Sequence, residues 1–521
     1  MKRHSSAWIV ILGSALLMPI LCAAGEAPNV DWGIQFGSTG YDFPREVAVD
    51  ANGNVYVVGE TNGNVGGGNA GLNDGFLVKT DLSGNREWAR QLGTLATESI
   101  TGVAVHSDQS VAIVGFTGGK LGAAQIGDVD LFVGRYDAQG NRIWLVQMGT
   151  TNADYSNRIA TDALGNCYIT GRTFGKMGEK NEGGSDIFVC KLDGQGNLKW
   201  TTQLGTIQND DGVDIKTAPG GELLIAGVTS GGFNVASRGG EDAVVAKLDS
   251  TGGVVWVRQF GTASQERARC VAAGDSGRVF VGGWTGGVMQ DRQYGGGDAI
   301  LVAFDRNGNP LWTRQFGTGN WDGAHGLASF QDGSGDVLIG GCWNYPTCSG
   351  WMRRYTDQGD LVWEKLISKT PSKSSCGQTL FVDPSGRCYH IGGTDDALFG
   401  DSHGLQDVFL VRLSDATGVN RSDPHPQGPK SFQLFQNTPN PFNPSTEIFY
   451  SLLRETYVRV SIADITGKTV ADLIDARQPA GTHSVRWHGK SDSGKPVGSG
   501  IYICRLISDG GAEMKKMTLI R

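Results

Sequence analysis

Acidic residues recur at a fixed step along most of the 521-residue chain. Several carboxylates brought together could bind Ca²⁺, which prefers oxygen ligands. They could instead be scaffold residues, each accepting backbone N–H bonds in its own loop. We favour the scaffold interpretation over a carboxylate ring for Ca²⁺ or a cationic partner, because a residue needed in every repeat serves the repeat. The six positions, each 56 residues from the next, are Asp42, Glu98, Asp154, Asp210, Glu266 and Asp322.

A site for an asymmetric ligand should lie where the repeat is broken, and the sixth repeat has lost five residues. There Ser349 stands where the period predicts Asp, and the loop GGCWNYPTCSGW replaces a Gly-rich loop. Aromatic residues near this break predict a surface for a sugar or a protein partner. The alternative is that they pack as a small core, held by a disulfide between Cys342 and Cys348. The four candidate ligand-binding residues are Trp284, Trp321, Trp343 and Tyr345.

The elements that must position these residues are short strands separated by turn chemistry. In the first repeat REVAVD, NVYVVGET, DGFLVKTD and REWARQLG read as strands, with D-x-x-G-N turns between the first and second and between the third and fourth. Four antiparallel strands without helical periodicity indicate a β-propeller blade. A Trp in the fourth strand marks each unit, at Trp32, Trp88, Trp144, Trp200, Trp256, Trp312 and Trp363.

Counting these units predicts an all-β fold, a seven-bladed β-propeller of four-stranded blades over residues 25–413. The strand of Trp32 precedes its partners, and the last set of three strands has no Trp strand after it. We therefore expect the Trp32 strand to close the last blade, which removes an open sheet edge.

The repeats resemble a known bacterial family, the SBBP β-propeller repeat. The resemblance rests on G-x-V-A-V-D-x-x-G-N-x-Y-V-x-G-x-T followed by D-x-F-L-V-K-x-D-x-x-G-N, and it extends over about residues 31–413. It implies a propeller and little about function, because propellers host many activities.

The N-terminus predicts export. Lys2 and Arg3 precede an apolar stretch that ends in small residues, so residues 1–24 read as a signal peptide cleaved after Ala24. The apolar stretch is too short for a membrane span, and no later segment is apolar enough to cross one. Removing the two basic residues changes the formal net charge from −8 to −10. This acidic balance argues against nucleic acid and anionic membranes as partners.

The C-terminal part is a separate module. Residues 414–431 read as a linker, and the alternating strands of residues 432–521 predict a small immunoglobulin-like β-sandwich. This segment resembles the type A C-terminal sorting domain of the type IX secretion system, which is related to the immunoglobulin-like domain of flagellar hook-capping proteins. The resemblance rests on Asn437, Pro439, Asn440, Pro441, Phe442, Asn443, Pro444, Gly500, Ile501 and Tyr502, among others.

The sorting resemblance implies that residues 432–521 contact the type IX machinery. It implies a secreted or cell-surface protein that is exported through the periplasm and the outer membrane. The alternative is a permanent immunoglobulin-like accessory domain with no sorting role.

We predict no catalytic residue and no cofactor other than the Ca²⁺ considered above, because no HExxH, GxSxG or phosphate-binding motif is present. The sequence favours a binding module for a glycan or protein over an enzyme. The alternatives are a polysaccharide lyase or hydrolase and a structural or adhesive surface component. Clustered His, Tyr, Arg and acidic side chains at the channel mouth would favour the enzyme, whereas a purely aromatic and Gly-rich mouth would favour binding.

Overall fold

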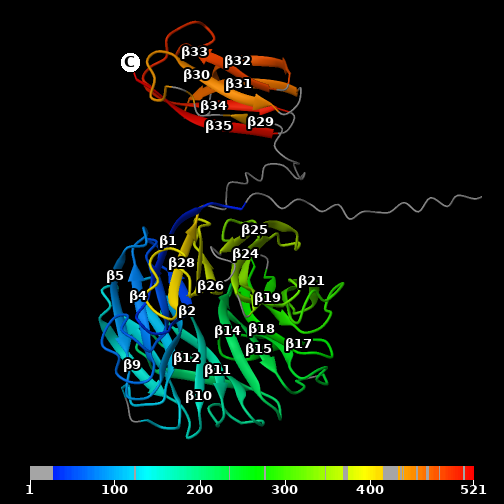
Figure 1. The fold of residues 1–521 in the computed structure, drawn as a ribbon. Coiled ribbons are helices and arrows are strands. Elements are labelled where there is room, and N and C mark those ends of the chain that lie inside the picture. Colours follow the sequence, from blue (N-terminus) through cyan, green and yellow to red (C-terminus); the bar gives the residue numbers. More distant parts are fainter. Residues whose placement is uncertain are drawn as a thin grey trace, which may run out of the picture. The chain divides into compact units, whose positions relative to one another are not determined.

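The computed structural model describes residues 27–520 apart from short gaps, which are 123–124, 234, 275–276, 346–347, 368–373, 415–431, 435–436, 438, 453–455, 465–468, 480 and 509–510. The expected signal peptide and nearly all of the expected linker lie outside the described residues. The chain divides into two compact units, Met1–Val419 and Asn420–Arg521. The described secondary structure is β throughout (Figure 1). None of it is a helix long and apolar enough to span a bilayer.

Five four-stranded antiparallel sheets follow one another along the first unit. The first contains β2 (Asp42–Val49), β3 (Val55–Thr61), β4 (Asp74–Thr80) and β5 (Arg86–Leu92), and the second β6 (Glu98–Val105), β7 (Val111–Thr117), β8 (Asp130–Tyr136) and β9 (Arg142–Met148). The third contains β10 (Asp154–Thr161), β11 (Cys167–Thr173), β12 (Asp186–Leu192) and β13 (Leu198–Leu204). The fourth contains β14 (Asp210–Ala218), β15 (Glu222–Thr229), β16 (Asp242–Leu248) and β17 (Val254–Phe260), and the fifth β18 (Glu266–Ala273), β19 (Val279–Thr285), β20 (Asp298–Phe304) and β21 (Pro310–Phe316).

The remaining strands of this unit form one eight-stranded sheet. It contains β22 (Trp321–Ser329), β23 (Val337–Tyr345), β24 (Ser349–Tyr355), β25 (Leu361–Ile367), β26 (Ser375–Val382), β27 (Cys388–Thr394), β28 (Asp407–Leu413) and β1 (Val30–Phe36). A single parallel pair, Ser349 with Ser375, joins β24 to β26. Isolated parallel bridges of the same kind connect other neighbouring sheets, for example Asn73 with Thr97. The large sheet is therefore two groups of four strands joined at one point, and β1 is the fourth strand of the second group, beside β28.

The first strand of each group lies innermost, and these strands contact one another in a closed ring, β2, β6, β10, β14, β18, β22 and β26. Apolar side chains of neighbouring groups fill the space between them. One such core combines Val57, Phe76 and Val78 of the first sheet with Tyr389 and Ile391 of β27. The core is thus divided into layers between sheets, as expected when each sheet is apolar on both faces.

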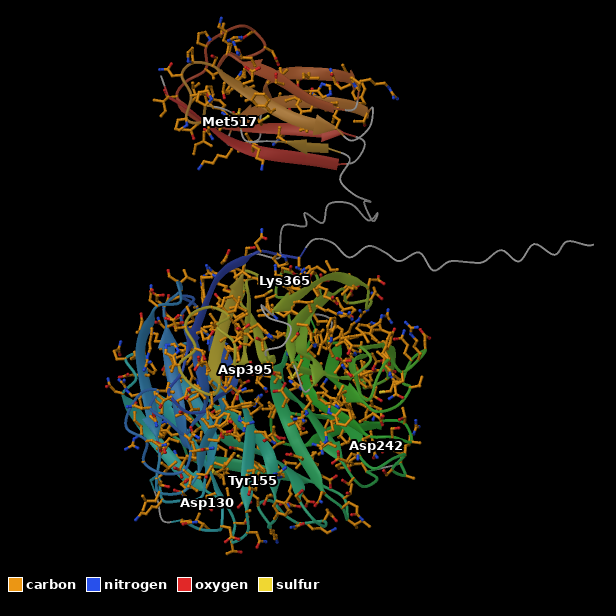
Figure 2. The ribbon with its side chains drawn as sticks, viewed as in Figure 1. Asp130, Tyr155, Asp242, Lys365, Asp395 and Met517 are labelled. Carbon is orange, nitrogen blue, oxygen red and sulfur yellow. A yellow bond between two sulfur atoms is a disulfide. The ribbon has the colours of Figure 1, made fainter. Side chains whose placement is uncertain are left out.

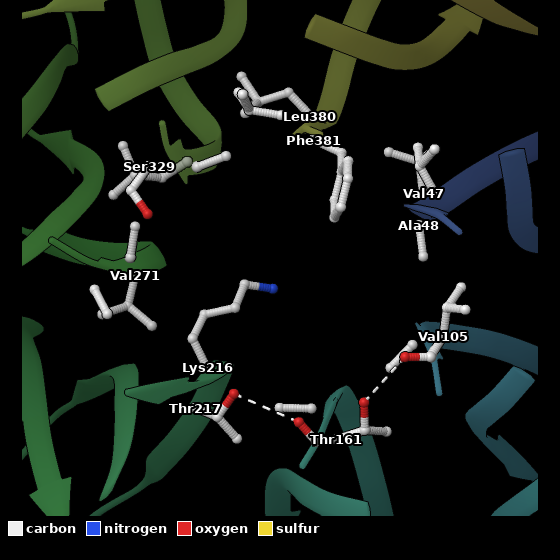
Figure 3. Close-up of a pocket in the computed structure, with 18 of the residues that line it drawn as sticks. Val47, Ala48, Val105, Thr161, Lys216, Thr217, Val271, Ser329, Leu380 and Phe381 are labelled. Atoms are coloured by element: carbon white, nitrogen blue, oxygen red, sulfur yellow. Dashed lines mark hydrogen bonds between the residues drawn. The ribbon is translucent and has the colours of Figure 1, made fainter. Parts of the chain in front are cut away.

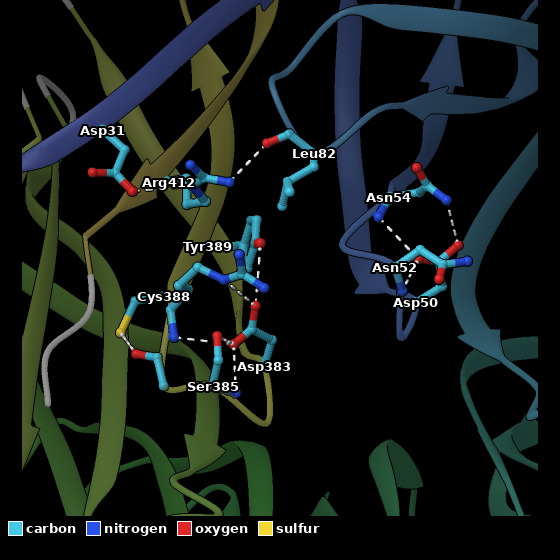
Figure 4. A network of polar contacts seen from close by, with 12 residues as sticks. Asp31, Asp50, Asn52, Asn54, Leu82, Asp383, Ser385, Cys388, Tyr389 and Arg412 are labelled. Atoms are coloured by element: carbon cyan, nitrogen blue, oxygen red, sulfur yellow. Dashed lines mark hydrogen bonds and ion pairs between the residues drawn. The ribbon is translucent and has the colours of Figure 1, made fainter. Parts of the chain in front are cut away.

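The D-x-x-G-N sequences form the tight turns that the sequence predicts. Asp50 Oδ1 accepts the backbone N–H groups of Asn52 and Asn54, both at 2.9 Å, and Gly53 has a φ of +83° (Figure 4). Only glycine adopts this φ without strain, which explains its recurrence at this place. The corresponding turn before β27 uses Asp383 with Ser385 in the same way.

The second unit has two sheets around one core. One contains β29 (Phe432–Leu434), β30 (Thr446–Leu452) and β33 (Gly481–Trp487), and the other β31 (Thr456–Asp464), β32 (Thr469–Gln478), β34 (Gly500–Ser508) and β35 (Gly511–Leu519). The Asn-Pro-rich segment before β30 holds the last strand. Asn440 Oδ1 accepts the N–H of Thr518 at 2.8 Å, and the N–H of Phe442 donates to the Thr518 carbonyl at 2.9 Å.

Candidate ligand site at the loop end of the channel

The inner strands surround a central channel, and all run through it in the same sense. We call the end at which they begin the loop end, and the end at which they finish, next to the first turn of each blade, the turn end. Five of the six repeated acidic residues begin an inner strand, at the loop end, and the sixth, Asp322, is the second residue of β22. Figure 2 shows the side chains of this unit, with Tyr155 of β10 labelled near the start of its strand.

The repeated carboxylates are fully buried and bonded within their own loops. Glu98 Oε2 accepts the backbone N–H of Thr94 at 2.5 Å, and Oε1 accepts the hydroxyl of Thr117 at 2.7 Å. Burial raises the pKa of Asp42, which makes similar bonds to its own loop. These contacts fit scaffold residues, since each carboxylate is engaged separately.

A second polar contact joins the third and fourth strands of most groups. Gln315 donates from Nε2 to Asp298 Oδ2 at 2.7 Å and to the Gly287 carbonyl at 2.8 Å. In the sixth repeat Ser349 and Leu366 occupy the two positions, so this contact is missing there. The equivalent pairs are Asp74–Gln91, Asp130–Gln147, Asp186–Gln203, Asp242–Gln259 and Asp407–Gln35.

The four predicted aromatic residues lie in two groups. The Trp284 and Trp321 rings meet edge to face at 5.5 Å, and Trp321 also lies 6.3 Å from the His325 ring. Trp343 instead stacks on the buried Trp351 at 5.6 Å and packs against the core between the fifth sheet and β22–β24. The backbone of Tyr345 pairs with Trp321, and its side chain is outside the described part of the molecule.

Cys342 and Cys348 form a disulfide. Cys376 lies on β26. Its sulfur atom and the two sulfur atoms of the disulfide are all within 4.8 Å of one another. Cys376 is a partly exposed free thiol, and burial raises its pKa to about 12.

The residue that follows the repeated acidic position in each inner strand (Ser375 holds that position in β26), together with its partner on the next strand, differs in every group. These pairs are the variable ring: Phe43–Glu60, Ser99–Phe116, Tyr155–Arg172, Asp211–Val228, Arg267–Trp284, Gly323–Cys342 and Cys376–Gly393. A β-bulge two residues later adds a second variable set: Arg45, Thr101, Asn157, Val213, Arg269, His325 and Gln378. Bulges of this kind re-aim side chains, often near functional sites.

Charged and aromatic side chains of the variable ring are linked across neighbouring strands. Asp211 accepts from Arg172 at 3.0 Å and from the Asn157 amide at 2.8 Å. The Arg172 guanidinium lies 4.9 Å from the centre of the Tyr155 ring, which meets Phe116 edge to face at 5.2 Å. The loop end therefore combines flat apolar rings with fixed hydrogen-bonding groups.

His325 belongs to the same end. Its Nδ1 lies 3.0 Å from the Gly377 carbonyl, and burial, followed by the charge of Arg269, lowers its pKa to about 4. The imidazole is therefore neutral at pH 7, with Nδ1 as the donor to the carbonyl. A neutral imidazole in this position can exchange a proton or a hydrogen bond with a ligand.

A belt of buried charges separates the loop end from the turn end. Glu46 Oε1 lies 3.6 Å from Arg158 Nε and 3.5 Å from Lys216 Nζ, which is also 3.3 Å from Asp214 Oδ1. Although burial lowers the pKa of Lys216, Asp214 and Glu46 raise it above its usual value. The belt is thus two cations facing two carboxylates.

The turn end is a mainly apolar cavity of about 450 Å³, lined by all the inner strands (Figure 3). The Lys216 amine points into it. The other inner strands carry Phe381 or a small residue at the equivalent position, namely Ala48, Ala104, Ala160, Ala272 and Ala328.

Of the variable ring only Trp284 and Cys342 were singled out from the sequence, and Lys216 was not predicted. The signal was present, because both stand at fixed offsets from the repeated Asp or Glu. The signal for these residues is a position whose residue changes from repeat to repeat. The repeat itself is recognised from the positions whose residue stays the same.

Comparisons with known proteins agree with this architecture. A β-propeller repeat model (SBBP) matches residues 31–67 and 143–175, and a FlgD Ig-like domain model matches residues 454–510. The regulatory protein FlaEY of Caulobacter vibrioides is 29% identical over 211 residues, which are 36% of this chain and 22% of that protein. The uncharacterized WD repeat-containing protein L264 of Acanthamoeba polyphaga mimivirus is 24% identical over 197 residues, which are 30% of this chain and 14% of that protein.

Solved structures with a similar fold include the Pan2 WD40 domain of Neurospora crassa, with a TM-score of 0.45 and 9% identity over 74% of this chain and 95% of that one. A polysaccharide lyase, the PL25 ulvan lyase, has a TM-score of 0.47 and 10% identity over 73% of this chain and 96% of that one. The chain spans less than a quarter of the curated relatives it matches. It contains SBBP β-propeller repeats followed by a FlgD-type Ig-like domain.

Proposed function

We propose that this protein is an exported binding module, a seven-bladed propeller whose ligand site is the loop end of the channel. The variable ring carries the proposal, since its residue pairs differ in every repeat while the surrounding positions keep their Asp, Thr, Gln and Trp in most repeats. A scaffold position repeats, whereas a surface shaped for one asymmetric ligand does not. Flat rings beside fixed polar groups suit a saccharide.

The blade count rests on the same repeats. The eight-stranded sheet divides at the single Ser349–Ser375 pair into two groups like the five separate sheets, which supports seven blades. Closure of the last blade by β1 supports the same count.

A glycan and protein array tests the binding role, with wild type and Tyr155→Ala. Trp343 is a poor choice for this test because it packs against Trp351. We expect a ligand that wild type retains and Tyr155→Ala loses, with Thr161→Ala at the turn end as the matched control that still binds. Equal binding by all three proteins would refute a loop-end site.

Export to the cell surface through residues 432–521 is the second part of the proposal. The FlgD-type match and the contacts between the Asn-Pro-rich segment and the last strand support a folded recognition domain. Fusing residues 432–521 to a periplasmic reporter, in a bacterium with a type IX system, should move the reporter to the surface or medium. A reporter that stays in the periplasm would favour a permanent accessory domain instead.

An enzyme that cleaves polysaccharides is the second candidate. Tyr155, Arg172, Asp211 and the neutral His325 all lie at the loop end, so the channel mouth has the mixture of side chains that favours an enzyme and is not purely aromatic and Gly-rich. Release of reducing or unsaturated ends from a polysaccharide, abolished in Tyr155→Phe or His325→Gln, would support it. Binding without any such release leaves the binding module as the function.

A further inference from the structure

Three of the four arginines around the variable ring have a carboxylate partner. Arg45 pairs with Glu60 at 2.9 Å, and Arg172 pairs with Asp211 at 3.0 Å. In the third pair, Arg267 donates to both oxygens of Glu241, at 2.6 and 2.7 Å. These three guanidinium groups are therefore neutralised within the protein.

Arg269 is the exception. It occupies the bulge position of β18, and it makes no ion pair or hydrogen bond with any part of the chain that the structure describes. Its Nε is buried without an acceptor, as are those of Arg45 and Arg172, so it is the missing ion pair that sets Arg269 apart. Burial and the neighbouring Arg267 lower its pKa, and the nearby carboxylate of Asp211 opposes them, so the cation is only partly compensated within the protein. Such a charge is costly to bury unless an anion meets it.

We infer that the loop end binds an anionic polysaccharide and that Arg269 holds one of its acidic groups, a carboxylate or a sulfate. The inference rests on the proposed binding function. Trp284, on the strand paired with that of Arg269, and Tyr155, elsewhere on the variable ring, offer ring faces for sugars, although Arg172 lies over one face of Tyr155. The Arg269 guanidinium offers two parallel N–H donors to an oxyanion. The nearby Asp211 is already satisfied by Arg172 and Asn157, so it leaves Arg269 free for the ligand.

Binding to three polymers tests the inference: polygalacturonate carries carboxylates, dextran sulfate carries sulfates and dextran is neutral. We expect wild type to bind at least one polyanion and to ignore dextran. Arg269→Gln should weaken that binding at least tenfold, and Arg269→Lys should weaken it less. Arg292→Gln is the matched control, because Arg292 is an exposed arginine in the loop of the same blade and should leave binding unchanged.

The outcomes separate this inference from the proposed function. Equal affinity for dextran, no binding to either polyanion, or full binding by a folded Arg269→Gln would overturn the anionic ligand. If Tyr155→Ala still abolished binding to some neutral ligand, the loop-end site would be supported and only the inference of an anionic ligand would be wrong. If no loop-end variant affected any ligand, both would fail.

A second inference concerns the cysteine group at the rim of the same ring. Cys348 lies directly beside the strand of Cys376: its carbonyl accepts the N–H of Ser375 at 2.7 Å, and its N–H donates to the Ser374 hydroxyl at 3.2 Å. This is the junction where β24 meets β26 and where the Asp–Gln contact is missing. Three sulfur atoms within 4.8 Å of one another allow more than one disulfide.

We propose that Cys376 exchanges with the Cys342–Cys348 disulfide. The Cys376 thiolate attacks the sulfur of Cys348, a Cys348–Cys376 bond forms, and Cys342 leaves as a thiolate that takes up a proton. One disulfide and one thiol are present before and after, so no oxidant or reductant is consumed. The new bond would join the sixth and seventh blades and remove the cross-link between Cys342 on β23 and Cys348.

A tryptic digest made without reducing the disulfides distinguishes the Cys342–Cys348 form from the Cys348–Cys376 form. The native disulfide lies within residues 315–353, whereas the exchanged one links that peptide to residues 374–387. After incubation at pH 9 and alkylation, we expect the linked pair together with alkylated Cys342. The rate should rise about tenfold for each pH unit, because a pKa of about 12 leaves little thiolate.

Cys376→Ser should keep only the internal disulfide at every pH. The linked fraction should not depend on protein concentration, since the exchange is within one chain. A wild-type protein that shows only the internal disulfide after prolonged incubation at pH 9 would overturn the exchange.

Discussion

The two ends of the channel are built by the same inner strands, yet they differ in composition. The loop end is uneven, with Tyr155, Asp211 and Arg267 at one structural position in three successive blades. The turn end is nearly uniform, with alanine at five of seven equivalent positions. Packing is the reason: toward the turn end, side chains must fit between adjacent blades, whereas a bulge turns the loop-end residues away from that packing.

Breaking the belt between the ends should have the largest effect. Glu46→Gln leaves Arg158 and Lys216 with Asp214 as the one remaining carboxylate of the belt. We expect a loss of about 3 kcal/mol in the free energy of unfolding, measured by urea denaturation, since one partner of a buried ion pair is removed. The loop-end variant Phe43→Ser should lose less than about 1 kcal/mol. Equal losses of unfolding free energy in Glu46→Gln and Phe43→Ser would mean that the belt contributes no more to the stability of the ring than the loop end does.

The repeated Asp–Gln contact gives the next largest effect. Asp298→Ala leaves the Gln315 amide and the N–H of Tyr294 without their buried acceptor, so we expect a loss of about 2 kcal/mol. The matched control is Ser349→Ala, at the same position in the sixth repeat, where the contact is already absent. A loss of similar size in both variants, seen as equal shifts in Tm, would contradict a scaffold role for Asp298.

Acid should weaken the ring through a buried histidine. His390 is fully buried on β27, where the other blades carry Val57, Ile113, Ile169, Ile225, Val281 and Ile339, and burial lowers its pKa to about 3. The unfolded chain binds a proton near pH 6.5, so stability is complete above that pH and falls toward pH 3. His390→Ile should gain about 1.4 kcal/mol over wild type for each pH unit in this window. Parallel stability–pH curves for the two proteins would show that His390 is not responsible.

A turn-end hydroxyl should give the smallest effect. Thr161 Oγ1 donates to the Val105 carbonyl at 3.3 Å and joins two inner strands (Figure 3). Thr161→Ala should cost about 0.5–1 kcal/mol of unfolding free energy and leave ligand binding unchanged. Reduced binding in this variant would place part of the ligand site at the turn end.

The repeated parts of the molecule were predictable from the sequence. Glycine and asparagine at fixed offsets predict the turns, and the spacing of Trp32 and Trp88 predicts where the outer strands fall. The turn residues act within their own blade, whereas each Trp also contacts the next one, as Trp32 Nε1 donates to the Leu82 carbonyl and Trp88 Nε1 to the Ala138 carbonyl, both at 3.1 Å. Both kinds of contact repeat with the period, so the sequence displays them.

The proposed ligand site was harder to predict because it depends on side-chain direction and on neighbours in other blades. Trp343 packs against Trp351 because strand pairing turns its side chain toward the core. The sequence around Trp343 reads as an exposed loop and does not predict this direction. Arg269 is distinguished by having no carboxylate at ion-pair distance, and that is visible only when Asp211 and Glu241 are seen to be paired with other arginines.

The pairing of β1 with β28 has a consequence for how the chain folds. Val30 meets Leu413, and Arg412 donates to the Leu82 carbonyl and pairs with Asp31 (Figure 4). These contacts join residues more than 300 positions apart, so their loop-closure entropy is among the largest in the chain. The backbone groups at the edge of β1 have no partner strand until β28 has been synthesised, when almost four fifths of the polypeptide has been made. Ring closure therefore reports that the propeller is complete, and a chain truncated before β28 keeps an open edge that quality-control proteases and chaperones can recognise.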